Sequence, residues 1–201
     1  MRPFVCWPVV VGCLVAAPSA PVCVCAVAKV HGGWCQACKV GYVASLKIES
    51  PMLYETLDNH GHDIDPKMIR CESCKKAVEV DGFCEACRIG YVRKQAYFIP
   101  LTYHLAKGEA KDPSKITCAA CRKNIEGGGW CETCKVGMIG NVAVKDRKGY
   151  EEAYQAFRRL RLAVSHLKEC ETCAVAMFMN SLCPKCRISY EDGKRVTASS
   201  P

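Results

Sequence analysis

The sequence predicts a small α+β protein in which short, cysteine-bounded β-hairpins repeat in tandem and are joined by short helices, as a quasi-linear array. Three observations lead to this prediction. Cysteines recur in closely spaced pairs with a fixed register, short β-branched segments follow the pairs, and amphipathic segments separate successive copies. Apolar residues are dispersed among these segments, so we expect the cysteines to replace a large hydrophobic core.

The cysteine repeat is clearest between Cys118 and Cys134, where two Cys-x2-Cys pairs are separated by nine residues. The same spacing recurs twice, and an altered copy lies upstream. The four sets are Cys23, Cys25, Cys35 and Cys38; Cys71, Cys74, Cys84 and Cys87; Cys118, Cys121, Cys131 and Cys134; and Cys170, Cys173, Cys183 and Cys186. Two thiolates from each of two facing turns can complete a tetrahedral metal site.

The high cysteine content, 18 of 201 residues, has two physical explanations. Such a chain carries either a disulfide framework or a set of metal sites. Disulfide scaffolds rarely repeat Cys-x2-Cys pairs in one register, whereas four-thiolate sites require that geometry, so the spacing favours metal.

The formal charge of +8 does not by itself indicate a nucleic-acid partner, because it counts every cysteine as neutral. A divalent ion with four thiolates carries a net charge of about −2, so four filled sites bring the chain close to neutrality. Basic residues directly follow many of the pairs, where we expect them to offset the sulfur charge. They are Lys39, Lys75, Arg88, Arg122, Lys135 and Arg187.

The first copy departs from the pattern, because Val22 occupies the position of its first cysteine and Cys23 stands one place later. In an extended strand, residues two apart share a face, so Cys23 and Cys25 can both reach one ion. His31 is the other candidate for the fourth ligand.

Short strands are expected after each second pair, at residues 39–43, 88–92, 135–139 and 187–190. One repeated position in them is expected to pack over the sulfur atoms: Tyr42, Tyr91, Met138 and Tyr190. Helices are expected after Ser50-Pro51, between Pro100 and Gly108, and between Tyr150 and Leu167.

Proline turns at Asp65-Pro66 and Asp112-Pro113 deliver the chain to the next cysteine pair, so the unit that repeats includes the linker. The predicted organisation is a signal peptide or anchor at 1–20, a degenerate first repeat with its helix at 21–61, a second repeat at 62–108, a third repeat with the longest helix at 109–168, a fourth repeat at 169–195 and a disordered tail at 196–201.

Each cysteine set closes on a residue that is aromatic in three copies: Trp34, Phe83 and Trp130, with Leu182 in the fourth. With this feature the sets resemble the short zinc-ribbon family, in which two cysteine knuckles on a β-hairpin bind one zinc ion. The resemblance covers about a third of the chain and implies that the cysteines of each set are ligands. The chain differs from that family at the residue after each pair, which is usually glycine there.

The N-terminal segment has the parts of a secretory signal: Arg2, a short apolar run and a small-residue zone ending near Ala20. Prolines within it argue against a membrane-spanning helix. Val10-Val11-Gly12-Cys13 resembles the bacterial lipoprotein processing box, which implies lipidation of Cys13 and periplasmic or extracellular export, with membrane anchoring as one form. Ordinary cleavage near Ala20, an uncleaved anchor and a buried apolar N-terminus are the alternatives.

Catalysis finds little support in the sequence, because four-cysteine sites are coordinatively closed and no nucleophile motif, phosphate loop or pair of carboxylates with matching spacing is visible. His60, His62 and Asp63 form one further polar cluster, which we interpret as a solvated loop. Covalent haem is disfavoured because no Cys-x2-Cys-His occurs.

We therefore expect a non-enzymatic, exported protein with three or four zinc ions that serves as a structural or protein-interaction subunit of a larger assembly. Iron in the same sites, with rubredoxin-like electron transfer, is one alternative, and zinc-dependent nucleic-acid binding is another, disfavoured by the charge argument. The N-terminus allows membrane attachment, and no small-molecule substrate is evident.

Overall fold

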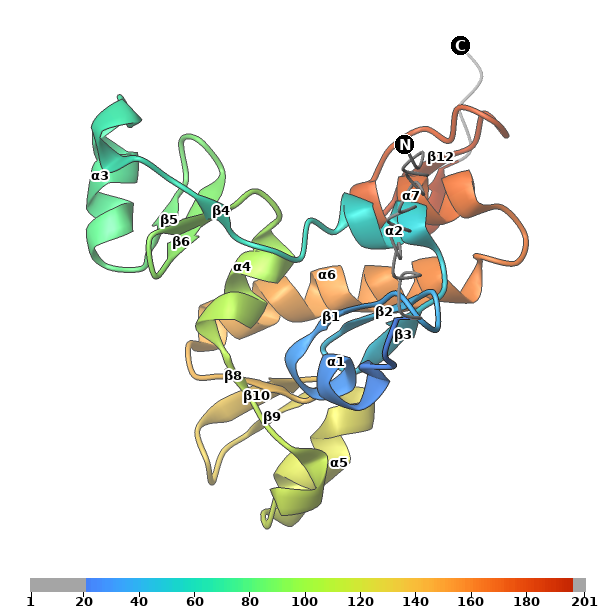
Figure 1. Ribbon diagram of the computed structural model, residues 1–201, viewed down its shortest axis with the longest axis horizontal. Helices are drawn as coiled ribbons and strands as arrows, with labels where there is room; N and C mark the ends of the chain where they lie inside the picture. The colour runs from blue at the N-terminus through green and yellow to red at the C-terminus, as the bar shows by residue number, and fades with distance from the viewer. Residues whose placement is uncertain (1–20, 197–201) are drawn as a thin grey trace, which may run out of the picture.

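The computed structural model describes residues 21–196 and has mixed α+β architecture (Figure 1). It contains four cysteine modules, and each combines a helix with an antiparallel hairpin. The first module comprises α1 (Cys25–His31), β1 (Gly33–Cys35), β2 (Val40–Val43) and β3 (Leu46–Ile48). The second comprises β4 (His62–Asp63), the 3-10 helix η1 (Pro66–Met68), α3 (Glu72–Glu79), β5 (Phe83–Cys84), β6 (Ile89–Val92) and β7 (Gln95–Tyr97).

The third module repeats the layout of the second, and the fourth is a shortened version. The third comprises β8 (Glu109–Ala110), η2 (Pro113–Lys115), α5 (Ala119–Gly127), β9 (Gly129–Cys131), β10 (Val136–Ile139) and β11 (Val142–Val144). The fourth comprises α7 (Glu171–Met179), β12 (Ser189–Glu191) and β13 (Lys194–Val196). The connecting helices are α2 (Pro51–Thr56), α4 (Pro100–Lys107) and α6 (Arg147–Ser165).

All strand pairs are antiparallel, and the sheets have the orders β1-β2-β3, β4-β7-β6-β5, β8-β11-β10-β9 and β12-β13. In the first three modules the second cysteine pair begins at the end of one strand, at Cys35, Cys84 and Cys131, and continues into the turn before the module's main strand. The first pair differs from the expected hairpin, because it opens a helix: Cys71, Cys118 and Cys170 are the N-cap residues of α3, α5 and α7. These short helices fill the nine-residue spacers.

The helices α2 and α4 begin where the sequence predicts them, whereas α6 begins at Arg147, three residues before the expected start. Ser50 caps α2 and accepts a hydrogen bond from the Leu53 amide at 2.9 Å, with Pro51 at the first helical position. Asp146 caps α6 in the same way, accepting from the Gly149 amide at 2.7 Å. The 3-10 helices η1 and η2 are capped by the aspartates of the two Asp-Pro turns.

The first, third and fourth modules share a hydrophobic core around α6, while the second module has smaller clusters of its own and is joined to α6 through α4 (Figure 1). Leu160 and Ala153 of α6 are fully buried in this core together with Leu53 of α2 and Leu101 of α4. The expected quasi-linear array is therefore wrong, because α2 of the first module packs against α7 of the last. The expectation that cysteine sites replace a large core is also wrong, because the buried residues of these helices and strands form one large hydrophobic cluster.

A buried asparagine also joins segments of different modules. The Asn141 side chain is fully buried and donates to the Val30 carbonyl at 2.7 Å and to the Lys111 carbonyl at 3.1 Å. It thereby satisfies two backbone acceptors at the place where the first and third modules meet.

Among residues 21–196, the helices are all too short or too polar to cross a bilayer.

Candidate metal centres

The structure brings sixteen cysteines into four clusters, and in each cluster all sulfur atoms lie within 4.8 Å of one another. The clusters contain the four sets identified in the sequence. The remaining cysteines, Cys6 and Cys13, lie outside the described residues, as does the processing site expected near Ala20.

The sulfur spacing matches that of a tetrahedral metal site. One Sγ–Sγ distance in each cluster illustrates this: 3.5 Å for Cys23–Cys38, 3.9 Å for Cys71–Cys84, 3.8 Å for Cys118–Cys131 and 3.7 Å for Cys170–Cys186. A zinc–sulfur bond of about 2.3 Å gives a tetrahedron with edges of about 3.8 Å. A disulfide would require about 2.05 Å. All sixteen cysteines in the clusters are free thiols.

Backbone conformation positions the second pair of each module. The residue that follows it adopts the left-handed conformation, with φ of 54° at Lys39, 59° at Arg88, 53° at Lys135 and 56° at Arg187. Glycine is the usual residue for this conformation. These four turns adopt it with long basic side chains in place of the glycine of zinc ribbons.

The basic side chains after the pairs contact polar residues of the same turn or helix. Lys135 Nζ lies 3.0 Å from Glu132, and Lys75 Nζ lies 2.6 Å from Glu72. Lys39 donates to Gln36 in the corresponding position. The fourth cysteine of each cluster is exposed, so these side chains leave one sulfur accessible: Cys38, Cys87, Cys134 and Cys186.

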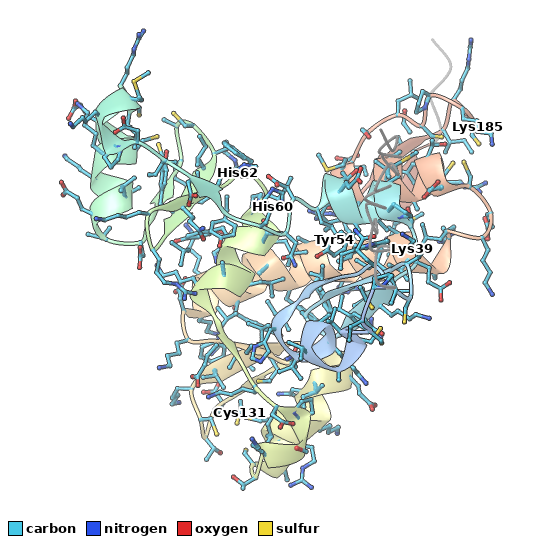
Figure 2. All side chains as sticks on the ribbon, in the orientation of Figure 1. Lys39, Tyr54, His60, His62, Cys131 and Lys185 are labelled. Carbon is cyan, nitrogen blue, oxygen red and sulfur yellow. The ribbon has the colours of Figure 1, made fainter. Side chains whose placement is uncertain are left out.

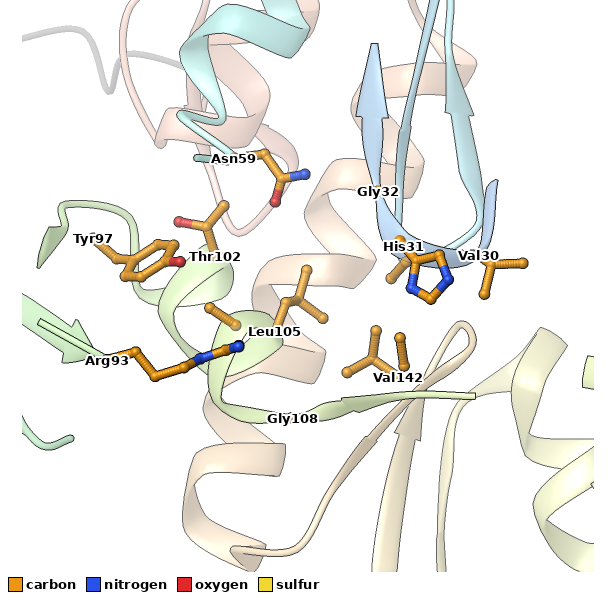
Figure 3. A pocket seen from close by; sticks show the side chains of 13 residues that line it. Val30, His31, Gly32, Asn59, Arg93, Tyr97, Thr102, Leu105, Gly108 and Val142 are labelled. Atoms are coloured by element: carbon orange, nitrogen blue, oxygen red, sulfur yellow. The ribbon is translucent and has the colours of Figure 1, made fainter. Parts of the chain in front are cut away.

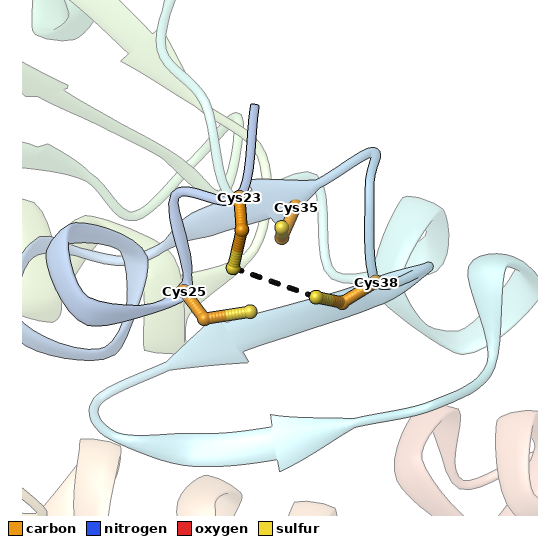
Figure 4. A group of neighbouring side chains, drawn as sticks. All are labelled: Cys23, Cys25, Cys35 and Cys38. Atoms are coloured by element: carbon orange, nitrogen blue, oxygen red, sulfur yellow. Dashed lines mark hydrogen bonds between the residues drawn. The ribbon is translucent and has the colours of Figure 1, made fainter. Parts of the chain in front are cut away.

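The first cluster forms in spite of its altered spacing (Figure 4). The expected extended strand is wrong, because Cys25 begins α1 and Cys23 lies just before the helix. The Val24 amide, between them, donates to Cys35 Sγ at 3.4 Å. His31, the other candidate ligand, does not belong to this cluster.

His31 instead lines a cavity of about 310 Å³ between the first three modules (Figure 3). Tyr97, Arg93 and Asn59 lie on the other walls of this cavity. Cys23 is therefore the residue that completes the first cluster.

Backbone N–H groups favour thiolates at the first cysteine of three modules. The Cys74 amide donates to Cys71 and lowers its pKa to about 7, and the Cys121 amide does the same for Cys118. At Cys170, a hydrogen bond from the Thr172 hydroxyl is the larger cause, and the pKa falls to about 6. Hydrogen bonds that favour the charged form lower a thiol pKa, and a thiolate is the form that binds metal.

One repeated position in the strand after each second cysteine pair packs over the sulfur atoms, as the sequence predicts. Tyr91 is buried beside Cys74 and Cys84, and Met138 is buried beside Cys121 and Cys131. The Tyr91 hydroxyl favours the thiolate of Cys74 and so opposes the burial that raises the Cys74 pKa. Tyr42 and Tyr190 occupy the equivalent positions, and their hydroxyls act in the same direction on the pKa of Cys25 and Cys173.

The third module lacks this hydroxyl because Met138 occupies the position. Burial raises the pKa of Cys121 strongly, and no tyrosine hydrogen bond offsets that effect. The four clusters therefore share their sulfur geometry but differ in the groups around the sulfur atoms.

One family model matches the chain, the laminin EGF domain, over residues 104–149. This segment contains the whole third cysteine set. No curated protein and no solved structure matches the chain. Together, the match and the four clusters indicate cysteine-rich modules of an extracellular type that are stabilised by metal or by disulfides.

Proposed function

We propose that each cysteine cluster binds one zinc ion and that the protein is a non-enzymatic, exported scaffold that contributes to a larger protein assembly. The observation that carries the zinc proposal is the convergence in every module of four sulfur atoms within 4.8 Å of one another, with one Sγ–Sγ distance per cluster of 3.5, 3.9, 3.8 or 3.7 Å, close to the edge of a zinc–sulfur tetrahedron. Four thiolates favour zinc among the common divalent ions that have no redox chemistry.

Coordinative closure supports the non-enzymatic role. Each cluster supplies four sulfur ligands to one ion, so no position is left for water or substrate. The first, third and fourth modules also share a hydrophobic core around α6, and α4 packs on both α6 and the second module, which joins the four modules into one framework. A framework of this kind presents fixed surfaces to a protein partner.

Export is supported by the secretory pattern of residues 1–20 and by the similarity of residues 104–149 to an extracellular domain family. Bound zinc would protect the thiolates in an oxidising compartment, where unprotected cysteine pairs form disulfides. The proposed localisation and the proposed metal are therefore compatible.

The test is the native mass of the intact protein, purified without added metal or reductant. We expect four zinc ions per chain, and after removal of the metal we expect free thiols at all clustered cysteines. A metal-free mass reduced by two hydrogens for each cysteine pair would overturn the proposal and favour the disulfide alternative that the laminin EGF similarity suggests.

Iron is the second candidate, because the same sulfur tetrahedra suit it. Four-thiolate iron sites absorb visible light, whereas zinc sites are colourless. Visible absorption of the purified protein, together with its metal content, separates electron transfer from a structural role. A coloured protein that contains iron would replace the zinc proposal with the rubredoxin-like one.

A further inference from the structure

A fifth cluster of potential ligands lies outside the cysteine modules, at Asp58, His60 and His62. Their ligand atoms all lie within 4.8 Å of one another. His62 Nε2 lies 2.8 and 2.9 Å from the two carboxylate oxygens of Asp58, and His60 Nδ1 lies 3.4 Å from one of them. The sequence indicates the two histidines but pairs them with Asp63, whose carboxylate instead accepts from Gln95.

Two elements of the fold position the residues of this cluster. Asp58 follows α2 in the left-handed conformation, with φ of 46°, and the chain reverses there. His62 lies in β4 and pairs with Ala96 of β7, so the sheet of the second module sets its backbone. The His62 ring also packs against Phe98 at a centroid distance of 5.0 Å, which restricts its rotation.

We propose that Asp58, His60 and His62 form a fifth metal site that binds an exchangeable divalent transition-metal ion such as Zn²⁺, Ni²⁺ or Co²⁺. Two imidazoles and one carboxylate are ligands that these ions accept in proteins. With bonds of about 2.1 Å, ligand atoms around one ion are separated by about 3.0 Å in an octahedron and about 3.4 Å in a tetrahedron. The observed contacts of 2.8, 2.9 and 3.4 Å span that range.

A simple ion pair explains less of this geometry. One carboxylate contacts both imidazole rings, and the rings lie 4.7 Å apart between centroids. Placing two histidines around one acceptor aims two nitrogen atoms at the same small volume, which is the arrangement that a cation requires.

The site would have open coordination positions that face a cleft. Three protein ligands leave at least one position free for water or another donor. The cleft, of about 490 Å³, is lined by Asp58, His60, Trp34, Tyr54 and Lys39. Figure 2 shows His60 between His62 and the Tyr54 and Lys39 side of the molecule.

Exposure makes this site different from the cysteine clusters. The His60 side chain is 74% exposed and that of Asp58 is 21% exposed. An ion held there is reached directly from solvent, so it should exchange faster than an ion enclosed by four sulfur atoms. A further ligand of this ion would be a small molecule with an oxygen donor atom that enters the cleft beside Lys39.

The test is metal titration of the full-length protein after desalting, followed by calorimetry and native mass. We expect one ion per chain beyond those already held by the cysteine clusters. We expect the affinity for the added ion to fall at least about tenfold in each of the variants His60→Ala, His62→Ala and Asp58→Asn. His31→Ala, which alters a histidine in a separate cavity, should leave its affinity unchanged.

Tryptophan fluorescence reports where the added ion binds. Trp34 lines the cleft, so added Ni²⁺ should quench its fluorescence in wild type and less so in His60→Ala. A wild-type circular dichroism spectrum and unfolding transition in each variant verify that it is folded. No extra ion in wild type, or an extra ion that all three site variants retain, overturns the proposal. This result is independent of whether the cysteine clusters hold zinc, iron or disulfides.

Discussion

The ring of Tyr103, in α4, lies directly against the backbone of Gly90 in β6. A Cβ atom added at Gly90 would lie 2.2 Å from two ring atoms. The same contact joins Gly41 to Tyr54, and Gly137 to Tyr150, each with the tyrosine in the connecting helix. In all three modules the glycine precedes the tyrosine by thirteen residues.

An aromatic residue on the neighbouring strand completes this contact. Phe83 pairs with Gly90 across β5 and β6, and its ring lies 5.4 Å from that of Tyr103. Trp34 and Trp130 occupy the equivalent positions beside Tyr54 and Tyr150. The missing side chain of glycine thus makes room for an aromatic ring that locks each connecting helix onto its module.

We predict that Gly90→Ala destabilises the protein by about 1–3 kcal/mol, because the added methyl group must displace the Tyr103 ring. The measurement is chemical denaturation of the metal-loaded protein. Gly127→Ala is the matched control, because nothing lies within 4 Å of a Cβ at Gly127. Equal stability of the two variants would show that the glycine–tyrosine contact does not constrain the fold.

Removal of the tyrosine hydroxyl over a cluster should speed metal loss. Tyr91→Phe deletes the hydroxyl that lowers the pKa of Cys74 but retains the ring that covers the sulfur atoms. We expect roughly a tenfold faster transfer of one metal ion per chain to a chelator, as is typical of changes to groups that support metal ligands. Tyr97→Phe, in the same module but away from the sulfur atoms, should show wild-type release. A wild-type rate in Tyr91→Phe would mean that the hydroxyl does not support the ligand.

Replacing one cysteine ligand should empty its own cluster and leave the others filled. Cys84→Ser replaces a buried sulfur atom in the second cluster, and we expect it to reduce the metal content by one ion per chain, measured by native mass. Cys13→Ser should retain the wild-type metal content, because Cys13 is expected to be a lipidation site and not a ligand. A loss of metal in Cys13→Ser would contradict that assignment.

His104 should make stability depend on pH. Its side chain is 11% exposed, and burial lowers its pKa below the usual value. A lowered histidine pKa means that the unfolded chain binds a proton more readily, so this contribution is present above about pH 6.5 and is lost as the pH falls through the folded pKa.

We therefore expect that His104→Gln loses less stability than wild type when the pH falls from about 7.5 to 5.5. The comparison of the two proteins is made by denaturation at each pH, because acid affects the cysteine clusters equally in both. A steeper loss in the variant would show that protonated His104 stabilises the folded protein, opposite to the expected effect of its burial.

Asn141 should contribute to the junction of the first and third modules. Asn141→Ala leaves the half-buried Val30 and Lys111 carbonyls without the Asn141 donor, and we expect a loss of about 1–3 kcal/mol in thermal or chemical unfolding. Asn124→Ala serves as the control, since Asn124 lies within α5 at a half-buried position. A neutral Asn141→Ala would show that water replaces the lost donor.

The sequence by itself determined the local features of this protein. The spacing of Cys118, Cys121, Cys131 and Cys134 and its repetition specify which cysteines can meet, because a two-residue gap allows only a tight turn or a first helical turn. Ser50-Pro51 specifies the start of α2 through capping, which also depends on neighbouring residues alone.

Only the tertiary structure decided how the modules meet. The sequence did not reveal that Cys71 and Cys118 open helices, because an eight- or nine-residue helix buried on one side has too few turns to produce a clear period. It also did not reveal the shared core around α6, the Asn141 junction or the pairing of Asp58 with His62. Each of these depends on chain reversals and long-range packing, and the free energy of such contacts is set by residues that are distant in sequence.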